Sequence, residues 1–190
     1  MLRIAILASG SGTNAERLVE FFQESDLACV KLIATNNPKA GVILRAEAQK
    51  VETLVFDAKT DLQQTLSTLV QKADVVLLAG YLKMIPASWT RAFQGRMLKI
   101  HPALLPKFGG KGMYGKHVHR AVSEAGETQT GITIHLVNEH YDEGAILAQF
   151  TVDIAPGEDP ELIEAKVREL ELDFYGPTVE GWIEHMTLNQ

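Results

Sequence analysis

His101 is the residue whose place in the sequence points most directly to chemistry. It follows the apolar segment 97–100 and precedes Pro102. A proline lacks an N–H for a strand ladder and pushes the preceding residue toward an extended conformation, so the imidazole is expected where a strand ends. Ligands bind at that edge in open α/β sheets, and histidine changes its charge near neutral pH. A structural hydrogen-bonding role is the alternative, so the choice depends on the other polar residues of the chain.

Asp142 is the carboxylate that we expect to work with His101. It lies in the segment 138–144, a tight connection between predicted strands at 130–137 and 145–152. Acidic residues are also common in turns because they form local hydrogen bonds. A His–Asp pair is a general acid–base device, since the carboxylate favours the imidazolium and would raise its pKa. No serine or cysteine lies in a G-x-S-x-G motif, so we expect acyl transfer to an amine, assisted by a proton donor and an oxyanion stabiliser.

A glycine-rich loop at 9–14 follows the apolar strand predicted at 2–7 and precedes a helix. This arrangement points backbone N–H groups and a helix N-terminus at an anion. A plain tight turn without a ligand is the alternative, because Gly-Ser turns are common.

The same loop also satisfies the dinucleotide pattern G-x-G-x-x-G/A through Gly10, Gly12 and Ala15. That pattern needs an acidic residue after the second strand, predicted at 30–35, where this chain has only Asn-Asn-Pro at 36–38. The missing acidic residue argues against a nicotinamide oxidoreductase and favours a single phosphate as the ligand.

The elements that must position these residues alternate between strand and helix. Strands are predicted at 2–7, 30–35, 53–56 and 74–79, and helices at 41–50 and 60–72. This alternation indicates βαβ units and a mainly parallel sheet. We therefore predict an α/β fold in one domain, 1–190: a doubly wound, mostly parallel Rossmann-like sheet with an antiparallel C-terminal strand pair and a long C-terminal helix. That helix is expected from Asp159-Pro160 to about Thr187, with a kink or restart at Pro177.

Two loops follow predicted strand ends. The apolar stretch 81–86 is equally consistent with core packing and with the wall of a flat ligand's pocket. The stretch 107–115 is rich in glycine and predicts a mobile surface loop that covers a site. His117 and His119 come next, but their spacing does not suit one helix face and no cysteine or acidic cluster completes a ligand set, so we expect no metal.

The composition of the chain argues against several classes of protein. The 190 residues carry a formal net charge of −6, which argues against a nucleic-acid binder with a broad basic face. A single cysteine excludes an internal disulfide and suits a reducing compartment. No segment has the length of a membrane span, and Met1 to Ala8 shows no cleavable signal pattern, so we expect a cytoplasmic protein. We expect its partners to be small molecules and the protein to be a monomer or homodimer.

Several segments together resemble the phosphoribosylglycinamide formyltransferase family of folate-dependent enzymes of purine synthesis. The resemblance extends from Ile4 to about Pro177, and the order and spacing of its segments are highly specific. These segments are 9–14 (SGSGTN), 78–82 (LAGYL), 100–107 (IHPALLPK), 131–135 (GITIH) and 141–144 (YDEG).

The resemblance implies a role for each of three groups of residues. It implies that His101 is the catalytic acid and that Asp142 raises its pKa and orders a water. It implies that the 5′-phosphate and the rest of glycinamide ribonucleotide are bound by Gly12, Thr13, Asn14, Arg168 and Glu171. It implies that 10-formyltetrahydrofolate, the co-substrate, is bound by Lys59 near its tail and by Leu82, Lys83, Met84, Ile85, Asn138, Glu139, His140 and Tyr141 around its pterin ring.

One residue departs from the family pattern: Lys99 stands where the family has an asparagine that donates to the oxyanion. Loss of one such donor lowers a rate by on the order of 10²–10³. The ammonium group of a lysine offers three donors and is able to replace the amide, so we count Lys99 among the catalytic residues. A cation beside His101 would also lower the pKa of the histidine and oppose Asp142. A milder departure is the glycine-rich insertion at 111–115, which the shortest family members lack.

The departure at Lys99 keeps alternative functions open. One alternative is an impaired or non-catalytic homologue that binds folate or a nucleotide. Another is a formyltransferase that acts on a different small amine, such as an amino sugar of a nucleotide-sugar. A transfer-RNA formyltransferase is expected to carry a further nucleic-acid-binding domain, and the related folate hydrolase an N-terminal regulatory domain; we expect neither in this chain.

Overall fold

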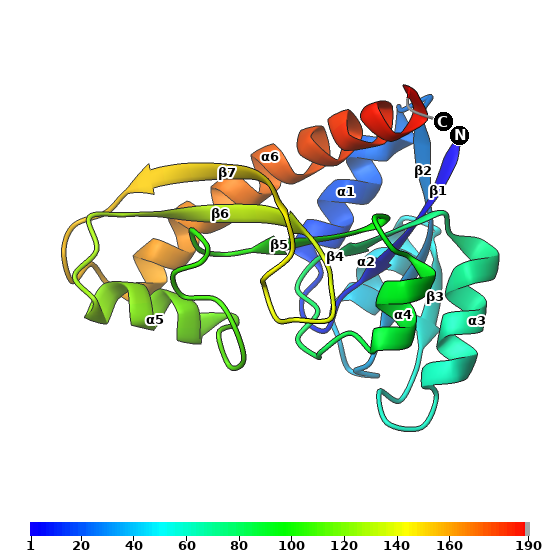
Figure 1. The fold of residues 1–190 in the computed structure, drawn as a ribbon, viewed down its shortest axis with the longest axis horizontal. Helices are drawn as coiled ribbons and strands as arrows, with labels where there is room; N and C mark the ends of the chain where they lie inside the picture. Colours follow the sequence, from blue (N-terminus) through cyan, green and yellow to red (C-terminus); the bar gives the residue numbers. More distant parts are fainter. Residues whose placement is uncertain (189–190) are drawn as a thin grey trace.

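A computed structural model describes residues 1–188 as a seven-stranded sheet with helices on both faces (Figure 1). The elements in chain order are β1 (Leu2–Leu7), α1 (Thr13–Gln23), β2 (Ala28–Thr35), α2 (Val42–Ala48), β3 (Glu52–Val55), α3 (Leu62–Lys72), β4 (Val75–Leu78), α4 (Ala87–Ala92), β5 (Met97–His101), α5 (Lys116–Glu124), β6 (Gln129–Leu136), β7 (Ile146–Asp153) and α6 (Pro160–Leu188).

The sheet has the strand order β3-β2-β1-β4-β5-β6-β7. The first five strands in this order are parallel, whereas β6 is antiparallel to both β5 and β7. The order reverses beside β1, as in doubly wound folds, and the carboxyl ends of β1, β4 and β5 meet at one edge. The predicted fold class and the antiparallel strand pair are therefore confirmed.

Two apolar cores lie on the opposite faces of the sheet. Alternate residues of β1 divide between them: Ile4 and Ile6 belong to one core, and Ala5 and Leu7 to the other. The first core receives apolar side chains from α1, α2, α5 and α6, and the second from α3 and α4. A strand buried on both faces needs an apolar run rather than an alternating pattern, which explains the composition of β1 and β4.

The turn between β1 and α1 depends on Gly12. Its φ is +81°, a conformation that L side chains rarely adopt, and a Cβ on this residue would lie 2.4 Å from Val42 Cγ2. Glycine therefore allows α2 to pack directly against the start of α1, and it directs the first turn of α1 toward the carboxyl edge of the sheet.

Three details of the prediction were wrong. Residues 87–92 form the short helix α4 after Pro86, a helix that we did not predict. The predicted restart at Pro177 does not occur: α6 is one helix on both sides of the proline, where Tyr175, Val179 and Trp182 are buried. The connection between β6 and β7 comprises residues 137–145 and is longer than a tight turn.

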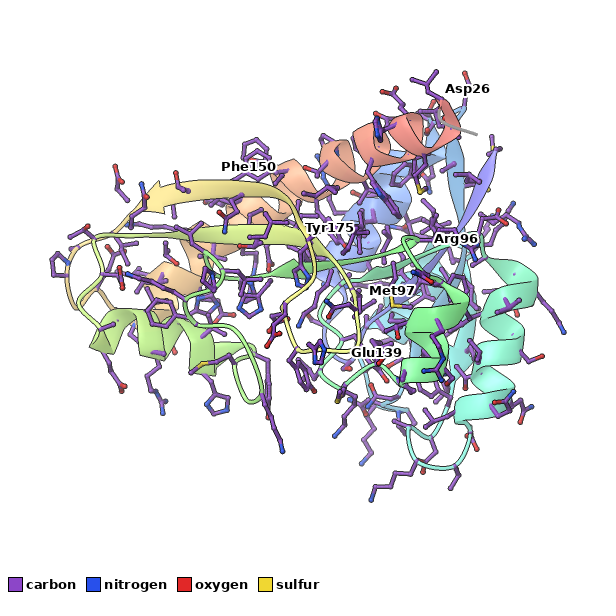
Figure 2. All side chains as sticks on the ribbon, viewed as in Figure 1. Asp26, Arg96, Met97, Glu139, Phe150 and Tyr175 are labelled. Atoms are coloured by element: carbon purple, nitrogen blue, oxygen red, sulfur yellow. The ribbon has the colours of Figure 1, made fainter. Side chains whose placement is uncertain are left out.

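Tyr175 ties α6 to the edge of the sheet that holds the site. Its hydroxyl donates to the carbonyl oxygen of Leu78, the last residue of β4, at 3.2 Å, and the side chain lies between α6 and the sheet (Figure 2). Burial raises the pKa of this phenol, so it stays neutral and keeps its proton for that hydrogen bond.

Among residues 1–188, none of the helices has both the length and the apolar composition of a membrane span.

Candidate active site

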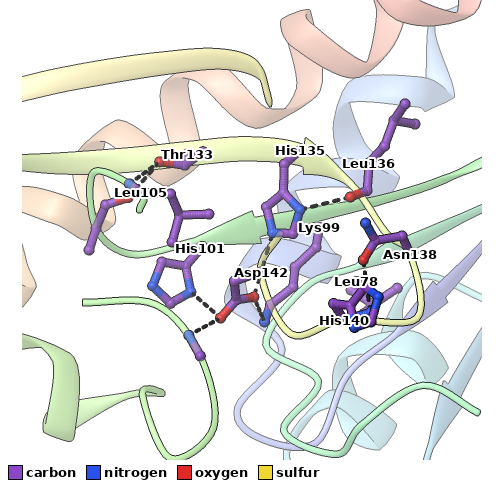
Figure 3. A network of polar contacts seen from close by, with 12 residues as sticks. Leu78, Lys99, His101, Leu105, Thr133, His135, Leu136, Asn138, His140 and Asp142 are labelled. Atoms are coloured by element: carbon purple, nitrogen blue, oxygen red, sulfur yellow. Dashed lines mark hydrogen bonds and ion pairs between the residues drawn. The ribbon is translucent and has the colours of Figure 1, made fainter. Parts of the chain in front are cut away.

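Four side chains meet at the carboxyl end of β5, and we call them the polar cluster: Lys99, His101, His135 and Asp142 (Figure 3). Lys99 and His101 are two residues apart on β5 and therefore lie on the same face of the sheet. Lys99 is also paired in register with His135 of β6. Asp142 belongs to the loop between β6 and β7, and this loop brings its carboxylate over the end of β5.

The carboxylate of Asp142 is the centre of the cluster. Lys99 Nζ donates to Oδ1 at 2.5 Å, and the backbone N–H of Gly110 donates to Oδ2 at 3.0 Å. His101 Nδ1 and His135 Nε2 lie 3.6 Å from Oδ2 and Oδ1, respectively, which is an ion-pair distance but too long for a hydrogen bond. Asp142 itself has a φ of +56°, a left-handed conformation that aspartate tolerates better than most residues.

His101 is almost fully enclosed, with 1% of its side chain exposed. Its Nε2 lies 2.8 Å from the carbonyl oxygen of Phe108. Because a carbonyl oxygen can only accept, Nε2 carries the proton of this hydrogen bond, and in the neutral ring Nδ1 is the unprotonated nitrogen that faces Asp142. The glycine-rich loop, 107–115, thus contacts the cluster twice, through Phe108 and Gly110.

Burial lowers the pKa of His101 from 6.5 to about 4. The charge of Asp142 opposes this decrease, whereas the charge of Lys99 adds to it. Burial alone would raise the pKa of Asp142, but His135, Lys99 and His101 outweigh burial and leave that pKa well below its usual range. The expectation of a raised pKa for His101 was therefore wrong. Asp142 acts in the predicted direction, but burial of the ring and the charge of Lys99 lower the pKa by more than Asp142 raises it.

The first cavity has a volume of about 230 Å³ and opens beside the glycine-rich turn before α1. The structure brings all five predicted ribonucleotide residues together in its wall. Asn14 Nδ2 donates to Glu171 Oε2 at 2.9 Å, and burial raises the pKa of Glu171 although this hydrogen bond opposes the change. The five residues are Gly12, Thr13, Asn14, Arg168 and Glu171.

The second cavity lies between the stretch after β4 and the loop between β6 and β7. It shares Leu78 and Lys99 with the first cavity, so these two side chains form the wall between the two spaces. Most of the predicted folate residues line it, and the loop residue Glu139 forms an ion pair with Arg91 of α4 at 3.1 Å. The predicted residues in this cavity are Lys83, Met84, Ile85, Asn138, Glu139, His140 and Tyr141.

Two predicted folate residues lie elsewhere. Leu82 lines the first cavity rather than the second. Its backbone N–H donates to Ser9 Oγ at 3.1 Å, which holds the residue against the glycine-rich turn. Lys59 lines a third cavity, which shares Lys83 and Met84 with the second. A ligand longer than the second cavity would therefore meet Lys59 only after passing these two residues.

Two histidines of the site were not predicted as functional. His135 is buried and faces Asp142, and His119 is buried in the wall of the first cavity with its Nδ1 lacking a hydrogen-bond partner. Burial lowers the pKa of His119. The position of His135 in an alternating strand was a signal that its side chain points inward, but nothing local in the sequence showed which residue it would contact.

Within the described residues, no group of three or more His, Cys, Asp or Glu side chains is arranged to hold a metal ion.

The fold and the cluster together define a class of protein. A doubly wound sheet places a buried histidine, a carboxylate and a lysine at the carboxyl edge of its strands, between two cavities. This is a Rossmann-like α/β protein with a buried polar cluster between two cavities at the carboxyl edge of its sheet.

The chain belongs to the formyl transferase family, whose profile matches residues 2–179. It is 41% identical over 182 residues to the chloroplastic phosphoribosylglycinamide formyltransferase of Arabidopsis thaliana. These residues make up 91% of this chain and 62% of the plant protein. It is 35% identical to phosphoribosylglycinamide formyltransferase of Haemophilus influenzae, over 96% of this chain and 87% of that protein. The chain thus spans about six tenths of the length of the plant relatives that it matches.

A solved structure supports the same family. The crystal structure of phosphoribosylglycinamide formyltransferase from Bacillus halodurans superposes with a TM-score of 0.86 at 33% identity, covering 99% of this chain and 97% of that one. This likeness extends through β6, β7 and α6, so the antiparallel strands and the long helix belong to the family fold.

Proposed function

We propose that the protein transfers the formyl group of 10-formyltetrahydrofolate to the amine of phosphoribosylglycinamide, a step of purine synthesis. One observation carries the proposal: two cavities share the wall formed by Leu78 and Lys99, and the polar cluster lies at this junction. A reaction between two bound molecules needs such an arrangement, because its rate depends on holding the reacting atoms close and aligned. The names of the relatives agree with this reaction and do not favour a non-catalytic binding protein.

The first cavity is the proposed site of the ribonucleotide. The turn at Gly12, Thr13 and Asn14 begins α1, where free N–H groups and the helix dipole favour a phosphate. Arg168 and Glu171 approach the same space from α6. In this proposal Glu171 accepts hydrogen bonds from the sugar hydroxyls, and Arg168 adds positive charge for the phosphate.

The second cavity is the proposed site of the folate. Ile85 is buried and Met84 is exposed, so together they offer an apolar surface to one face of the pterin ring. The loop residues Asn138 to Tyr141 form the other wall and supply polar groups for the ring edges. Lys59, beyond Lys83, then meets the acidic tail of the folate. Leu82 contributes from the wall of the first cavity.

The proposed chemistry begins with attack of the substrate amine on the formyl carbon. The carbonyl then becomes a tetrahedral oxyanion, and its charge is stabilised by groups of the polar cluster. As the intermediate collapses, the bond between the formyl carbon and N10 of the folate breaks and N10 gains a proton. His101 moves that proton, and Asp142 positions His101 and a water. Folate acts as a co-substrate, and the proposal assigns no role to a metal.

The experiment that tests this function mixes purified protein with 10-formyltetrahydrofolate and phosphoribosylglycinamide and follows tetrahydrofolate formation. We expect turnover that depends on both substrates, with no turnover of glycinamide without its phosphoribosyl group. Turnover only with an amino sugar of a nucleotide-sugar would replace the amine in this proposal. Tight binding of both ligands without turnover, in the wild type and in a Lys99→Asn variant, would support the binding-protein alternative instead. We further propose a cytoplasmic monomer or homodimer whose partners are these small molecules.

A further inference from the structure

Lys99 is the feature of the site that the family pattern does not explain. Its side chain is 18% exposed, and its ammonium lies in the wall between the two cavities. The charged and titratable groups that face it are Asp142 and Tyr141 from the loop, His135 from β6 and His101 from its own strand. Tyr141 presents its ring to the ammonium, with Nζ 5.9 Å from the ring centroid.

The two basic side chains of β5 differ in the donors that remain for a ligand. Both ring nitrogens of His101 are directed at protein atoms, Nε2 at the Phe108 carbonyl and Nδ1 at Asp142. The ammonium of Lys99 has three N–H groups, and among the described residues it donates a hydrogen bond only to Asp142. Lys99 therefore keeps donors for a ligand at the junction, whereas His101 has none until the ring leaves one of its partners.

From this geometry we propose that Lys99, and not a protonated His101, supplies the positive charge that stabilises the oxyanion, so that His101 acts as a neutral proton carrier. This inference rests on the proposed function and assigns the charges within that site. Asp142 is then a positioning residue, because it fixes the ammonium at the junction. An ammonium held in place before the reaction needs no rearrangement when the oxyanion forms, which is the condition for strong electrostatic stabilisation.

The proton balance follows from this assignment. The amine nitrogen forms a bond to the formyl carbon while the carbonyl electron pair moves to oxygen, where Lys99 donates a hydrogen bond. The attacking nitrogen keeps its additional proton while the oxyanion exists, so His101 is still neutral when Lys99 stabilises that charge. When the carbon–N10 bond breaks and the carbonyl re-forms, His101 accepts the proton from the amine nitrogen and passes it to N10. The ring begins and ends neutral, Lys99 keeps its charge throughout, and the folate leaves as tetrahydrofolate.

The burial of the ring supports this assignment. The low pKa of His101, about 4, keeps the ring neutral at physiological pH, and burial is its main cause. Lys99 adds to the decrease because its positive charge disfavours the imidazolium form of the ring. If Lys99 is replaced by a neutral residue, Asp142 is left with the histidines as its charged partners, and the pKa of His101 should rise.

The test is the pH dependence of kcat, measured at saturating substrates for the wild type, Lys99→Asn, Lys99→Met and Lys31→Asn. Lys31 is an exposed lysine on β2 that lines none of the three cavities described above, so its variant controls for the loss of one positive charge from a strand. We expect Lys99→Met to lower kcat by on the order of 10²–10³-fold, as for loss of one oxyanion donor. We expect Lys99→Asn to retain more activity, because the amide keeps a donor.

The shape of the profile separates a catalytic cation from a structural lysine. In the wild type, kcat should not fall as pH rises through the pKa of His101, because Lys99 supplies the charge. In Lys99→Asn the imidazolium must supply it, so kcat should fall as pH rises through the pKa that His101 has in that variant. Identical profiles for the wild type and Lys99→Asn, or full kcat in Lys99→Met, would overturn the inference. A wild type without turnover at any pH would instead overturn the proposed function.

A second measurement does not depend on turnover. Titration of the His101 ring by NMR in the apo protein should show an apparent pKa that increases by on the order of one unit in Lys99→Met and stays unchanged in Lys31→Asn. Equal values in the wild type and Lys99→Met would show that the ammonium does not act on the ring, and would overturn the charge assignment even if Lys99→Met were poorly active.

Discussion

The anion-binding turn and the polar cluster are two halves of one site, but they are built in different ways. The turn consists of consecutive residues, 9–14, and offers backbone N–H groups at the start of α1. The cluster brings together β5, β6 and two loops, and its shortest contact joins residues 43 positions apart. Local backbone geometry produces the first, whereas the second exists only when the whole sheet is formed.

The difference also concerns free energy. Backbone N–H groups at a helix end are tolerated without a ligand because water can reach them. Charges inside the protein are tolerated only when they have partners, so each member of the cluster depends on the others. A substitution in the cluster should therefore alter several groups at once, while a substitution in the turn should act through shape alone.

Asp142→Asn is the change that tests this dependence most strongly. The substitution keeps the shape of the side chain but leaves the Lys99 ammonium without its counterion and both histidines without a carboxylate. We expect kcat to fall on the order of 10³-fold, within the range for loss of acid–base assistance. Glu143→Gln is the matched control, since Glu143 is the adjacent carboxylate and is exposed, and its kcat should stay within twofold, about the effect of an exposed charge. Similar losses in both variants would contradict a specific role for Asp142.

The dependence of stability on pH should reveal the buried ring of His101. Its pKa is about 4 in the folded protein and 6.5 in the unfolded chain, so between these values the unfolded state binds the additional proton. Stability from this group is complete above pH 6.5 and is lost as pH falls toward 4, by about 3 kcal/mol in total. Glu171, whose pKa is raised by burial, contributes with the opposite sign, so the measurement must be a difference between proteins.

Urea unfolding at a series of pH values supplies that difference. His101→Gln should show a smaller loss of unfolding free energy than the wild type between pH 6.5 and 4. His117→Gln removes an exposed histidine from the adjacent helix α5 and should follow the wild-type curve. Parallel curves for His101→Gln and the wild type would mean that the ring is not held neutral by burial.

Gly12→Ala tests whether the shape of the anion-binding turn matters independently of the polar cluster. A methyl group at this positive φ would meet Val42 at 2.4 Å, so either α1 or α2 must shift. We expect a loss of stability of about 2 kcal/mol and at least tenfold weaker binding of phosphoribosylglycinamide, with little effect on the pKa of His101. Gly10→Ala is the control, because its Cβ would meet nothing within 4 Å and its φ is not positive. Equal effects at Gly10 and Gly12 would show that shape does not explain the turn.

Lys59→Ala should have the smallest effect. Lys59 lies in the third cavity, and its proposed contact with the folate tail is exposed to solvent. We expect the KM for 10-formyltetrahydrofolate to rise by about twofold to threefold with no change in kcat, since an exposed ion pair is worth at most about 1 kcal/mol. A steady-state comparison with Lys31→Ala measures this, and an effect that persists at high salt would contradict the ionic explanation.

Much of the fold and the turn could be predicted because their signals are local. Apolar runs marked the strands, and the glycines after β1 marked the turn. The end of β5 at His101 followed from Pro102. The continuity of α6 through Pro177 could not be predicted in this way, because packing on the sheet overrides the local effect of the proline. Helix α4 is only six residues long and offered too short a pattern.

The site was predictable in its composition but not in its electrostatics. Most of the residues predicted from the resemblance line the two cavities, whereas Leu82 lines the first cavity instead of the second and Lys59 lines a third. The pairing of Lys99 with Asp142 and the position of His135 depend on the register between β5 and β6, which no local pattern contains. The sign of the pKa shift of His101 depends on burial, which exists only in the folded protein.

In the proposed function, two separate cavities hold two ligands that meet at the polar cluster. Tetrahydrofolate lacks the formyl group, so it and phosphoribosylglycinamide can occupy the protein together without reacting. The decisive measurement is a calorimetric titration of phosphoribosylglycinamide with and without saturating tetrahydrofolate. We predict one site for each ligand and binding of the ribonucleotide that is retained or strengthened in the presence of the folate. Competition between the two ligands would contradict it.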